Sequence, residues 1–184
     1  MQQVKGSVLK SRLAFVEQHG GPDAVARVLA TLPPADRAAL KSLVAIQWCP
    51  FDLGRRLDDA IVTVLGGGRA QFFERLGAAS ADANLTGAHK AFLTPGDPQA
   101  FLAKAPQIYK LYYDTGHRDY APDGPTAALL TTHDAETFSA PDCLTVIGWH
   151  RRALEMCGAE KVQIVEEECR ARGGAVCRYR ISWS

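Results

Sequence analysis

Apolar residues recur at helical spacing through the first two-thirds of this 184-residue chain, and the pattern then becomes that of strands. Prolines stand in the first turn of several helical segments and glycines at their ends, which are the places where helices tolerate them. Pro106 lies inside the last of these segments and should kink it or split it in two. The expected helices cover residues 4–18, 23–32, 35–45, 51–65, 69–85 and 98–116.

The last third of the chain combines a strand segment, a helix and a hairpin. Residues 126–139 are rich in threonine and apolar side chains, which predicts one strand, or two strands about a turn at 133–134. A helix is expected over 141–158, followed by a hairpin over 161–183. We therefore predict a single α+β domain, residues 1–184, in which an N-terminal helical half packs on an antiparallel sheet that ends in a C-terminal helix and β-hairpin.

Composition and charge exclude several classes of function. The formal net charge is only +1, whereas a nucleic-acid-binding face needs a surplus of cations. No apolar run approaches the roughly 18 residues of a membrane span. The first residues carry lysine and arginine inside their apolar pattern, unlike a signal peptide, so we expect a cytoplasmic protein with reduced cysteines.

The terminal hairpin places a carboxylate on a face that should be buried. Alternate residues from Cys177 to Trp183 are apolar or sulfur-containing and should face the core. On the preceding strand, Glu166 shares a face with Val162 and Ile164, which marks that face as the inward one. An isolated buried carboxylate costs several kcal/mol and needs a partner, and a divalent cation would supply one.

Cysteines near Glu166 provide the other ligands of a candidate metal site. Cys169 follows Glu166 by three residues, in the turn, and Cys177 begins the next strand. A fourth ligand would close the site, and Cys143 is the best candidate, with His150 second. Thiolates and a carboxylate are zinc ligands, so the sequence predicts a structural zinc ion.

Other interpretations of the same residues remain open. A glutamate at a strand end is commonly solvated or paired with a cation, here Arg178. A cysteine on an inward strand face is commonly part of the core. A disulfide between Cys169 and Cys177 is geometrically conceivable, but a reducing compartment disfavours it.

Residues 148–183 resemble the C-terminal half of the 4-vinyl reductase (V4R) domain, through the pattern E-x-x-C-x7-C at Glu166, Cys169 and Cys177. That family is related to ligand-binding domains of nitric-oxide signalling and to core subunits of the TRAPP complex in Golgi transport. In phenol-sensing regulators with this domain, the motif binds zinc together with an earlier cysteine, and Cys143 stands at the matching position. The resemblance implies a V4R/TRAPP-like fold and the same four ligands.

Two further resemblances concern larger parts of the chain. The N-terminal "VKGSVLKSRLAFVEQHGG" is similar to the opening helix of haem nitric-oxide-binding domains, and the whole chain resembles a paralogous family of myxobacterial proteins. The haem-binding branch uses a Y-x-S-x-R motif that this sequence lacks, so haem is not expected. The ATPase and DNA-binding segments of the phenol sensors are also missing.

We expect a non-catalytic sensory or binding module with an apolar chamber for an apolar or aromatic small molecule. Such pockets have apolar walls and a few fixed polar groups. His89 or His117 would provide a polar contact to the ligand. The expected lining consists of Phe72, His89, Phe92, Tyr109, Tyr112, Tyr113 and Trp149.

Two other functions are weighed against this one. The chain would serve as a homodimeric interaction scaffold of TRAPP-subunit type, acting with a small GTPase, if the segment "YKLYYDTG" were partly exposed as a contact patch. A tetrapyrrole reductase or a zinc hydrolase is less favoured, because the sequence has no dinucleotide-binding loop and no H-E-x-x-H motif. We therefore do not expect an enzyme.

Overall fold

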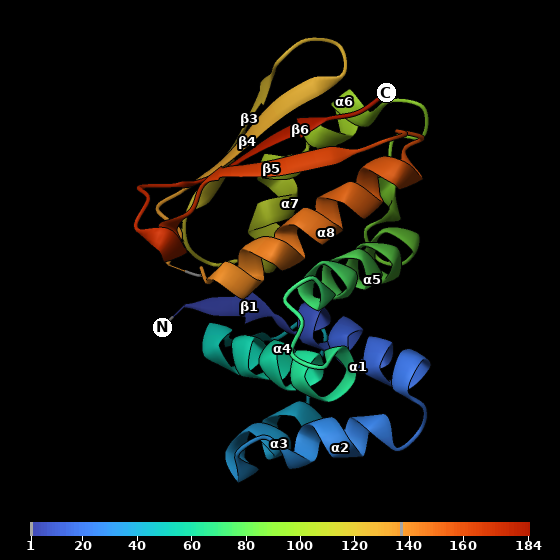
Figure 1. The fold of residues 1–184 in the computed structure, drawn as a ribbon, viewed down its shortest axis with the longest axis vertical. Coiled ribbons are helices and arrows are strands. Elements are labelled where there is room, and N and C mark those ends of the chain that lie inside the picture. Colours follow the sequence, from blue (N-terminus) through green and yellow to red (C-terminus); the bar gives the residue numbers. More distant parts are fainter. Residues whose placement is uncertain (1, 137) are drawn as a thin grey trace.

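The computed structural model describes residues 2–136 and 138–184. Helices form the N-terminal half, at the bottom and centre of Figure 1, and the sheet lies at the top. A short antiparallel pair, β1 (Gln3–Lys5) and β2 (Trp48–Pro50), joins the start of the chain to the start of the fourth helix. The helices are α1 (Gly6–Gly20), α2 (Ala24–Ala30), α3 (Pro34–Lys41), α4 (Phe51–Gly66) and α5 (Phe72–Thr86).

Two short helices replace the long one expected over 98–116. After a 3-10 turn, η1 (Lys90–Phe92), the chain forms α6 (Pro98–Leu102) and α7 (Ala105–Tyr112). Pro106 lies in the first turn of α7, so the segment is split rather than kinked. The Asp97 side chain caps α6 by accepting a hydrogen bond from the backbone N–H of Ala100 at 2.8 Å.

The main sheet has the antiparallel order β3-β4-β6-β5. Its strands are β3 (His117–Pro122), β4 (Ala127–His133), β5 (Gln163–Glu168) and β6 (Cys177–Ser182). The expected single strand over 126–139 is therefore too long. β4 ends at His133 and the chain bends at Asp134, with φ +52°, but no second strand follows within the described part of that segment. The β3–β4 hairpin instead turns through Asp123–Gly124–Pro125, where Gly124 has φ +95°.

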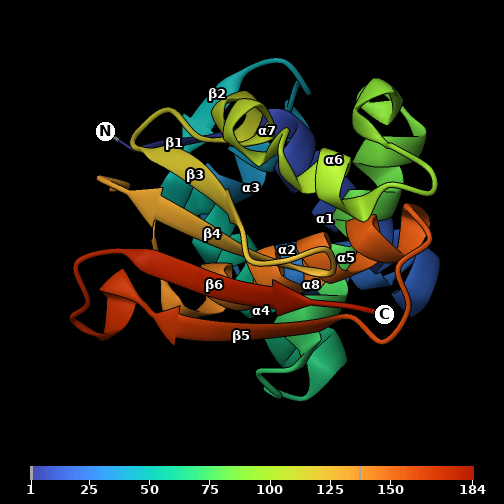
Figure 2. The same cartoon turned by 90° about the horizontal axis from the view of Figure 1, so that it is seen from above.

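Helix α8 (Ala140–Met156) runs along one face of this sheet (Figure 2). Helix α5 packs against the side of α8 that faces away from the sheet (Figure 1). The backbones of α5 and α8 approach closely at two glycines. A Cβ atom on Gly77 would lie 1.9 Å from the carbonyl oxygen of Thr145, and one on Gly148 would lie 1.9 Å from that of Glu74. Only glycine permits this contact, which fixes the two helices side by side.

The buried residues form two apolar clusters. One unites α1 to α5 around Leu57, Ile61 and Leu76, and the other fills the space between the sheet, α7 and α8 around Leu130 and Ile181. The α+β class and the helical half packed on an antiparallel sheet are confirmed. Among the described residues, no helix combines the length and the apolar character that crossing a bilayer requires.

Candidate functional site

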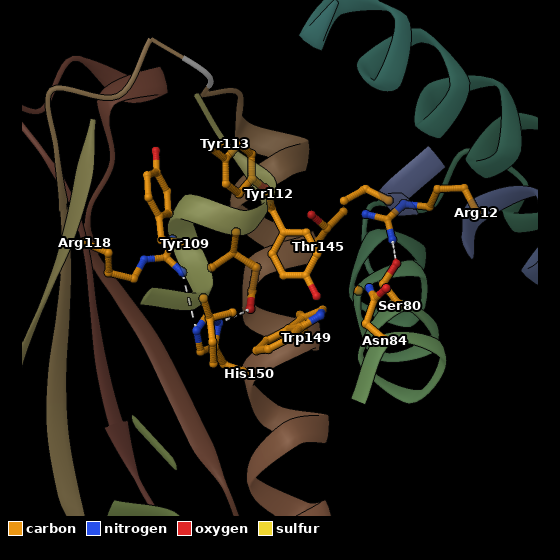
Figure 3. Close-up of a pocket in the computed structure, with 14 residues that line it drawn as sticks. Arg12, Ser80, Asn84, Tyr109, Tyr112, Tyr113, Arg118, Thr145, Trp149 and His150 are labelled. Atoms are coloured by element: carbon orange, nitrogen blue, oxygen red, sulfur yellow. Dashed lines mark hydrogen bonds between the residues drawn. The ribbon is translucent and has the colours of Figure 1, made fainter. Parts of the chain in front are cut away.

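A chamber lies where the helical half meets the sheet, between α1, α5, α7, α8 and β3. Its free volume is about 50 Å³, and both aromatic and charged side chains point into it (Figure 3). The chamber is lined by Val8, Arg12, Gly77, Ser80, Asn84, Ile108, Tyr109, Tyr112, Tyr113, Arg118, Thr145, Val146, Trp149 and His150.

His150 is held in its neutral form on the sheet side of the chamber. Burial and the nearby Arg118 guanidinium lower the pKa of His150 to about 3. Its Nδ1 lies 2.9 Å from the carbonyl oxygen of Val146 and donates to it, which leaves the Nε2 lone pair facing Arg118 at 3.4 Å. Arg118 is itself fixed by donating to Thr132 Oγ1 at 2.9 Å. The ring therefore presents an unprotonated nitrogen toward the chamber wall.

A second buried guanidinium stands on the helical side. Arg12 Nε donates to Asp58 at 2.9 Å, and Nη1 donates to the carbonyl oxygen of Leu76 at 2.8 Å and to Ser80. The Arg12 side chain is 5 % exposed, so this ion pair is screened little by solvent. The chamber thus lies between two immobilised cations, Arg12 and Arg118 (Figure 3).

Two polar atoms of the chamber wall are buried without a hydrogen-bond partner among the described residues. These atoms are Tyr112 Oη and Asn84 Nδ2. Burial raises the pKa of Tyr112 well above its usual value, so the hydroxyl keeps its proton and is able to donate. Leaving such groups unpaired costs about 1–3 kcal/mol each. The chamber is therefore prepared for a molecule that accepts hydrogen bonds.

The structure brings four of the seven expected ligand-binding residues to this chamber: Tyr109, Tyr112, Tyr113 and Trp149. The other three do not line it. Phe72 packs edge-on against Phe15 in the helical cluster, and His89 and Phe92 lie behind Tyr112. His117 is exposed on the opposite face of the sheet from α8.

Sequence reasoning missed the charged groups of the chamber. Arg12 lies four residues after Val8, on the buried stripe of α1, and was not singled out. Arg118 is likewise buried, and so is the neutral His150, which was named only as the second candidate for the fourth metal ligand and lies in the chamber instead. The available signal was their position: each stands where the helix or strand period requires an inward residue. A charge at such a position indicates a partner inside the protein.

The hairpin cysteines and Glu166 converge at one point near the N-terminal end of α8. The candidate ligand atoms of Cys143, Glu166, Cys169 and Cys177 all lie within 4.8 Å of one another. Cys143 Sγ is 3.5 Å from Cys169 Sγ and 3.9 Å from Cys177 Sγ. None of the cysteines forms a disulfide.

The Glu166 carboxylate is buried as strand parity predicts, although its ion pair differs from the alternative considered. Its side chain is 7 % exposed and pairs with Arg172, while Arg178 pairs with Glu168 at 3.4 Å. No N–H or O–H group of the described residues donates to Glu166 Oε1, which is buried. An orphaned carboxylate oxygen beside three sulfurs is suited to a cation.

One of the three thiols is poised to ionise. Cys143 donates toward Cys177 Sγ, which lowers the pKa of Cys177 to about 6. The pKa of Cys143 rises in return, because its proton is held in that hydrogen bond. Burial raises the pKa of Cys169. The thiolate form of Cys177 is the form that binds metals.

The arrangement of helices and sheet is that of H-NOX proteins. The structure of an Fe(II) unliganded H-NOX protein from K. algicida matches with a TM-score of 0.74 at 13% identity, covering 98% of this chain and 96% of that one. An H-NOX protein from S. oneidensis in the Fe(II)NO ligation state matches with a TM-score of 0.74 at 16% sequence identity, covering 98% of this chain and 99% of that one. An oxygen-binding H-NOX domain related to soluble guanylate cyclases matches with a TM-score of 0.72 at 12% sequence identity, covering 98% of this chain and 95% of that one.

The chain belongs to the family described as "Protein of unknown function (DUF2378)", which matches residues 7–184. No curated protein matches the sequence. The expected relation to nitric-oxide signalling domains is therefore supported at the level of the fold.

These matches contradict the expected cofactors. The sequence favoured structural zinc and made haem unlikely, whereas one matched structure concerns haem redox potential and porphyrin distortion, and another concerns haem distortion in the H-NOX family. The matches point to haem rather than zinc. The expectation against haem rested only on the absence of a Y-x-S-x-R string from the sequence.

Proposed function

We propose that this protein is a non-catalytic sensory module that binds a small molecule in the chamber between the helical half and the sheet. The observation that carries the proposal is the pair of buried, unpartnered polar atoms, Tyr112 Oη and Asn84 Nδ2, in a cavity that also contains fixed charges. A ligand that accepts hydrogen bonds would satisfy both atoms. Buried polar groups without partners are rare in folded proteins unless they serve such a role.

Haem is the ligand that the H-NOX likeness suggests, and the chamber suits it in the kind of groups present. His150 offers a neutral imidazole, and Arg12 and Arg118 offer cations for propionate groups. A bound haem would supply an iron that coordinates a diatomic gas. The free volume of about 50 Å³ is well below the roughly 300–1,000 Å³ of ligand pockets, so the walls of the chamber must move apart to admit a porphyrin.

The test is a titration of the purified full chain with haemin, followed by the Soret absorbance, alongside thermal melts with small aromatic compounds. We expect saturable binding that Tyr112→Phe and Asn84→Leu each weaken at least tenfold. Tyr120→Phe, a tyrosine of β3 that does not line the chamber, is the matched control and should bind like the parent protein. If neither haemin nor any small compound binds saturably, the proposal is wrong.

We also propose that Cys143, Glu166, Cys169 and Cys177 bind one metal ion that ties the start of α8 to the β5–β6 hairpin. The unpartnered Glu166 Oε1 and the sulfur distances support this role. Mass spectrometry of protein purified without chelators or a metal-affinity column should find about one ion per chain and identify it. The Cys169→Ser, Cys177→Ser double variant should lose that ion and part of its stability. A metal-free native protein with unchanged stability would contradict the assignment.

A binding role is favoured over the two alternatives considered. Tyr109 and Tyr112 of the "YKLYYDTG" segment are buried, so these side chains do not form the exposed patch that a TRAPP-type scaffold would use. Homodimerisation, a small GTPase partner, kinship with the 4-vinyl reductase domain, a myxobacterial paralogous family and a cytoplasmic location stay predictions. The matched H-NOX structures include one in the Fe(II)NO ligation state and one that binds oxygen, which supports a binding role over a catalytic one.

A further inference from the structure

The outer face of the main sheet carries a second group of metal-ligating side chains, at the opposite surface from the chamber. His117 and Asp119 stand two residues apart on β3, and both are exposed. His133, at the end of β4, is the direct cross-strand partner of His117. Residues i and i+2 share a face, and directly opposed residues are neighbours across the ladder. The register therefore gathers all three side chains on one side of the β3–β4 pair.

The three side chains are already close enough to act together. One ligand atom from each lies within 4.8 Å of the other two. His133 Nε2 is 3.2 Å from Asp119 Oδ2, and the imidazole rings of His117 and His133 stack with centroids 5.0 Å apart. Ligand atoms around a tetrahedral ion with bonds of about 2.0–2.1 Å lie about 3.3 Å apart. The Asp119–His133 distance already has this value, and a turn of the exposed His117 ring would complete the set.

Neighbouring residues hold the backbone of the group in place. Gly116, directly before His117, has φ +72°, and a Cβ atom there would lie 2.4 Å from the carbonyl oxygen of His133. The Tyr109 hydroxyl donates a hydrogen bond to the carbonyl oxygen of Thr115 at 2.8 Å. The backbone N–H of Glu136 donates to the Thr115 hydroxyl oxygen at 3.1 Å. The segments before β3 and after β4 are thus tied together, and a site on a rigid frame loses less entropy on binding.

We propose that His117, Asp119 and His133 form a metal site for a first-row transition-metal dication. Two imidazoles and one carboxylate suit Zn²⁺, Cu²⁺, Ni²⁺, Co²⁺ or Fe²⁺, whereas Mg²⁺ and Ca²⁺ prefer oxygen ligands throughout. Three protein ligands at the surface leave the remaining positions to water or to another molecule. The ion would lie between His133 Nε2 and Asp119 Oδ2, which already face each other at 3.2 Å. The site is independent of the chamber and of the cysteine cluster.

The test is isothermal titration of the untagged full chain with NiCl₂ at neutral pH. We expect His117→Ala and His133→Ala each to abolish one binding equivalent, and Asp119→Asn to weaken that equivalent at least tenfold while keeping the shape of the side chain. His19→Ala, which removes an exposed histidine of α1 outside the group, is the matched control and should titrate like the parent protein.

A parallel titration with CoCl₂ separates this site from the cysteine cluster. Thiolate ligation of Co²⁺ gives an intense sulfur-to-metal charge-transfer band, and imidazole–carboxylate ligation does not. The histidine variants should lose an equivalent without changing that band. Circular dichroism verifies that each variant is folded. If His117→Ala and the parent protein bind Ni²⁺ with the same stoichiometry and affinity, or if neither binds, the proposed site does not exist.

Discussion

A buried neutral histidine makes stability depend on pH in a defined direction. The pKa of His150 is about 3 in the folded protein and 6.5 in an ordinary environment. The unfolded chain therefore takes up a proton at this residue below pH 6.5, while the folded chain resists until about pH 3. Stability is lost as the pH falls through that window, by about 2 kcal/mol at pH 5.

The measurement is urea unfolding at pH 7 and pH 5 of the parent protein and of His150→Gln. The variant should lack about 2 kcal/mol of the acid destabilisation seen in the parent. Comparing the two proteins is necessary, because burial raises the pKa of Asp58 and this carboxyl shifts stability the opposite way. An identical pH dependence in the two proteins would show that His150 is protonated in the folded state.

The unpartnered hydroxyl of Tyr112 has opposite effects on stability and on binding. Removing an unsatisfied buried group relieves a desolvation cost, so Tyr112→Phe should stabilise the ligand-free protein by about 1 kcal/mol. For a chain of this length the melting temperature should rise by about 2–4 °C. Calorimetry of the ligand-free protein tests this, with Tyr120→Phe as control. A lower melting temperature would mean that Tyr112 Oη has a partner in solution.

Residue positions explain what the sequence predicted well and what it did not. Strand parity placed Cys177, Tyr179 and Glu166 inward, because the period of two leaves no freedom once one face is apolar. Arg12 and Arg118 escaped notice because long charged side chains are usually at the surface, and nothing local reveals the partner that buries them.

At the scale of elements, the α5–α8 crossing is the contact least tolerant of change. An alanine at Gly148 would place its Cβ against the backbone of Glu74, and backbone cannot move aside as a side chain can. We expect Gly148→Ala to lower the free energy of unfolding by about 1–3 kcal/mol or more. Chemical denaturation measures the change.

Gly54 in α4 is the matched control for that substitution. A Cβ atom there would meet side chains of Leu9 and Val4 at 3.5 Å, which is ordinary contact. Gly54→Ala should therefore gain the helix propensity of alanine, about 1 kcal/mol. If both alanine variants are equally stable, the close approach of α5 and α8 is not maintained in solution.

The elements that sequence analysis missed are short or depend on distant partners. β1 and β2 have three residues each and exist only because the start of the chain lies beside residues 48–50. β3 was not predicted, since its alternation is brief and its partner β4 supplies the reason for its extended form. The long amphipathic helices and the terminal hairpin carry their own periodicity and were predicted.

At the scale of the whole molecule, ligand binding to the chamber should stabilise the folded state. A ligand that binds only the folded protein, at one hundred times its dissociation constant, adds about 2.7 kcal/mol. Differential scanning calorimetry of the haemin-saturated protein should therefore show a higher melting temperature that depends on ligand concentration. Under the same conditions Asn84→Leu should show a smaller rise. An unchanged melting temperature with saturating haemin would mean that haemin does not bind the folded protein in preference to the unfolded chain, which contradicts the proposed site.

The backbone contact of α5 with α8 also determines which parts are free to move when the chamber fills. Gly77 and Gly148 interlock the two helices, so they cannot slide past each other and must travel as one rigid unit. Expansion of the cavity is therefore left to the opposite walls, α1 and α7. Filling the chamber would then move α1 and α7 outward against a stationary α5–α8 unit, so that occupancy of the interior changes the relative positions of the helices and not their internal structure.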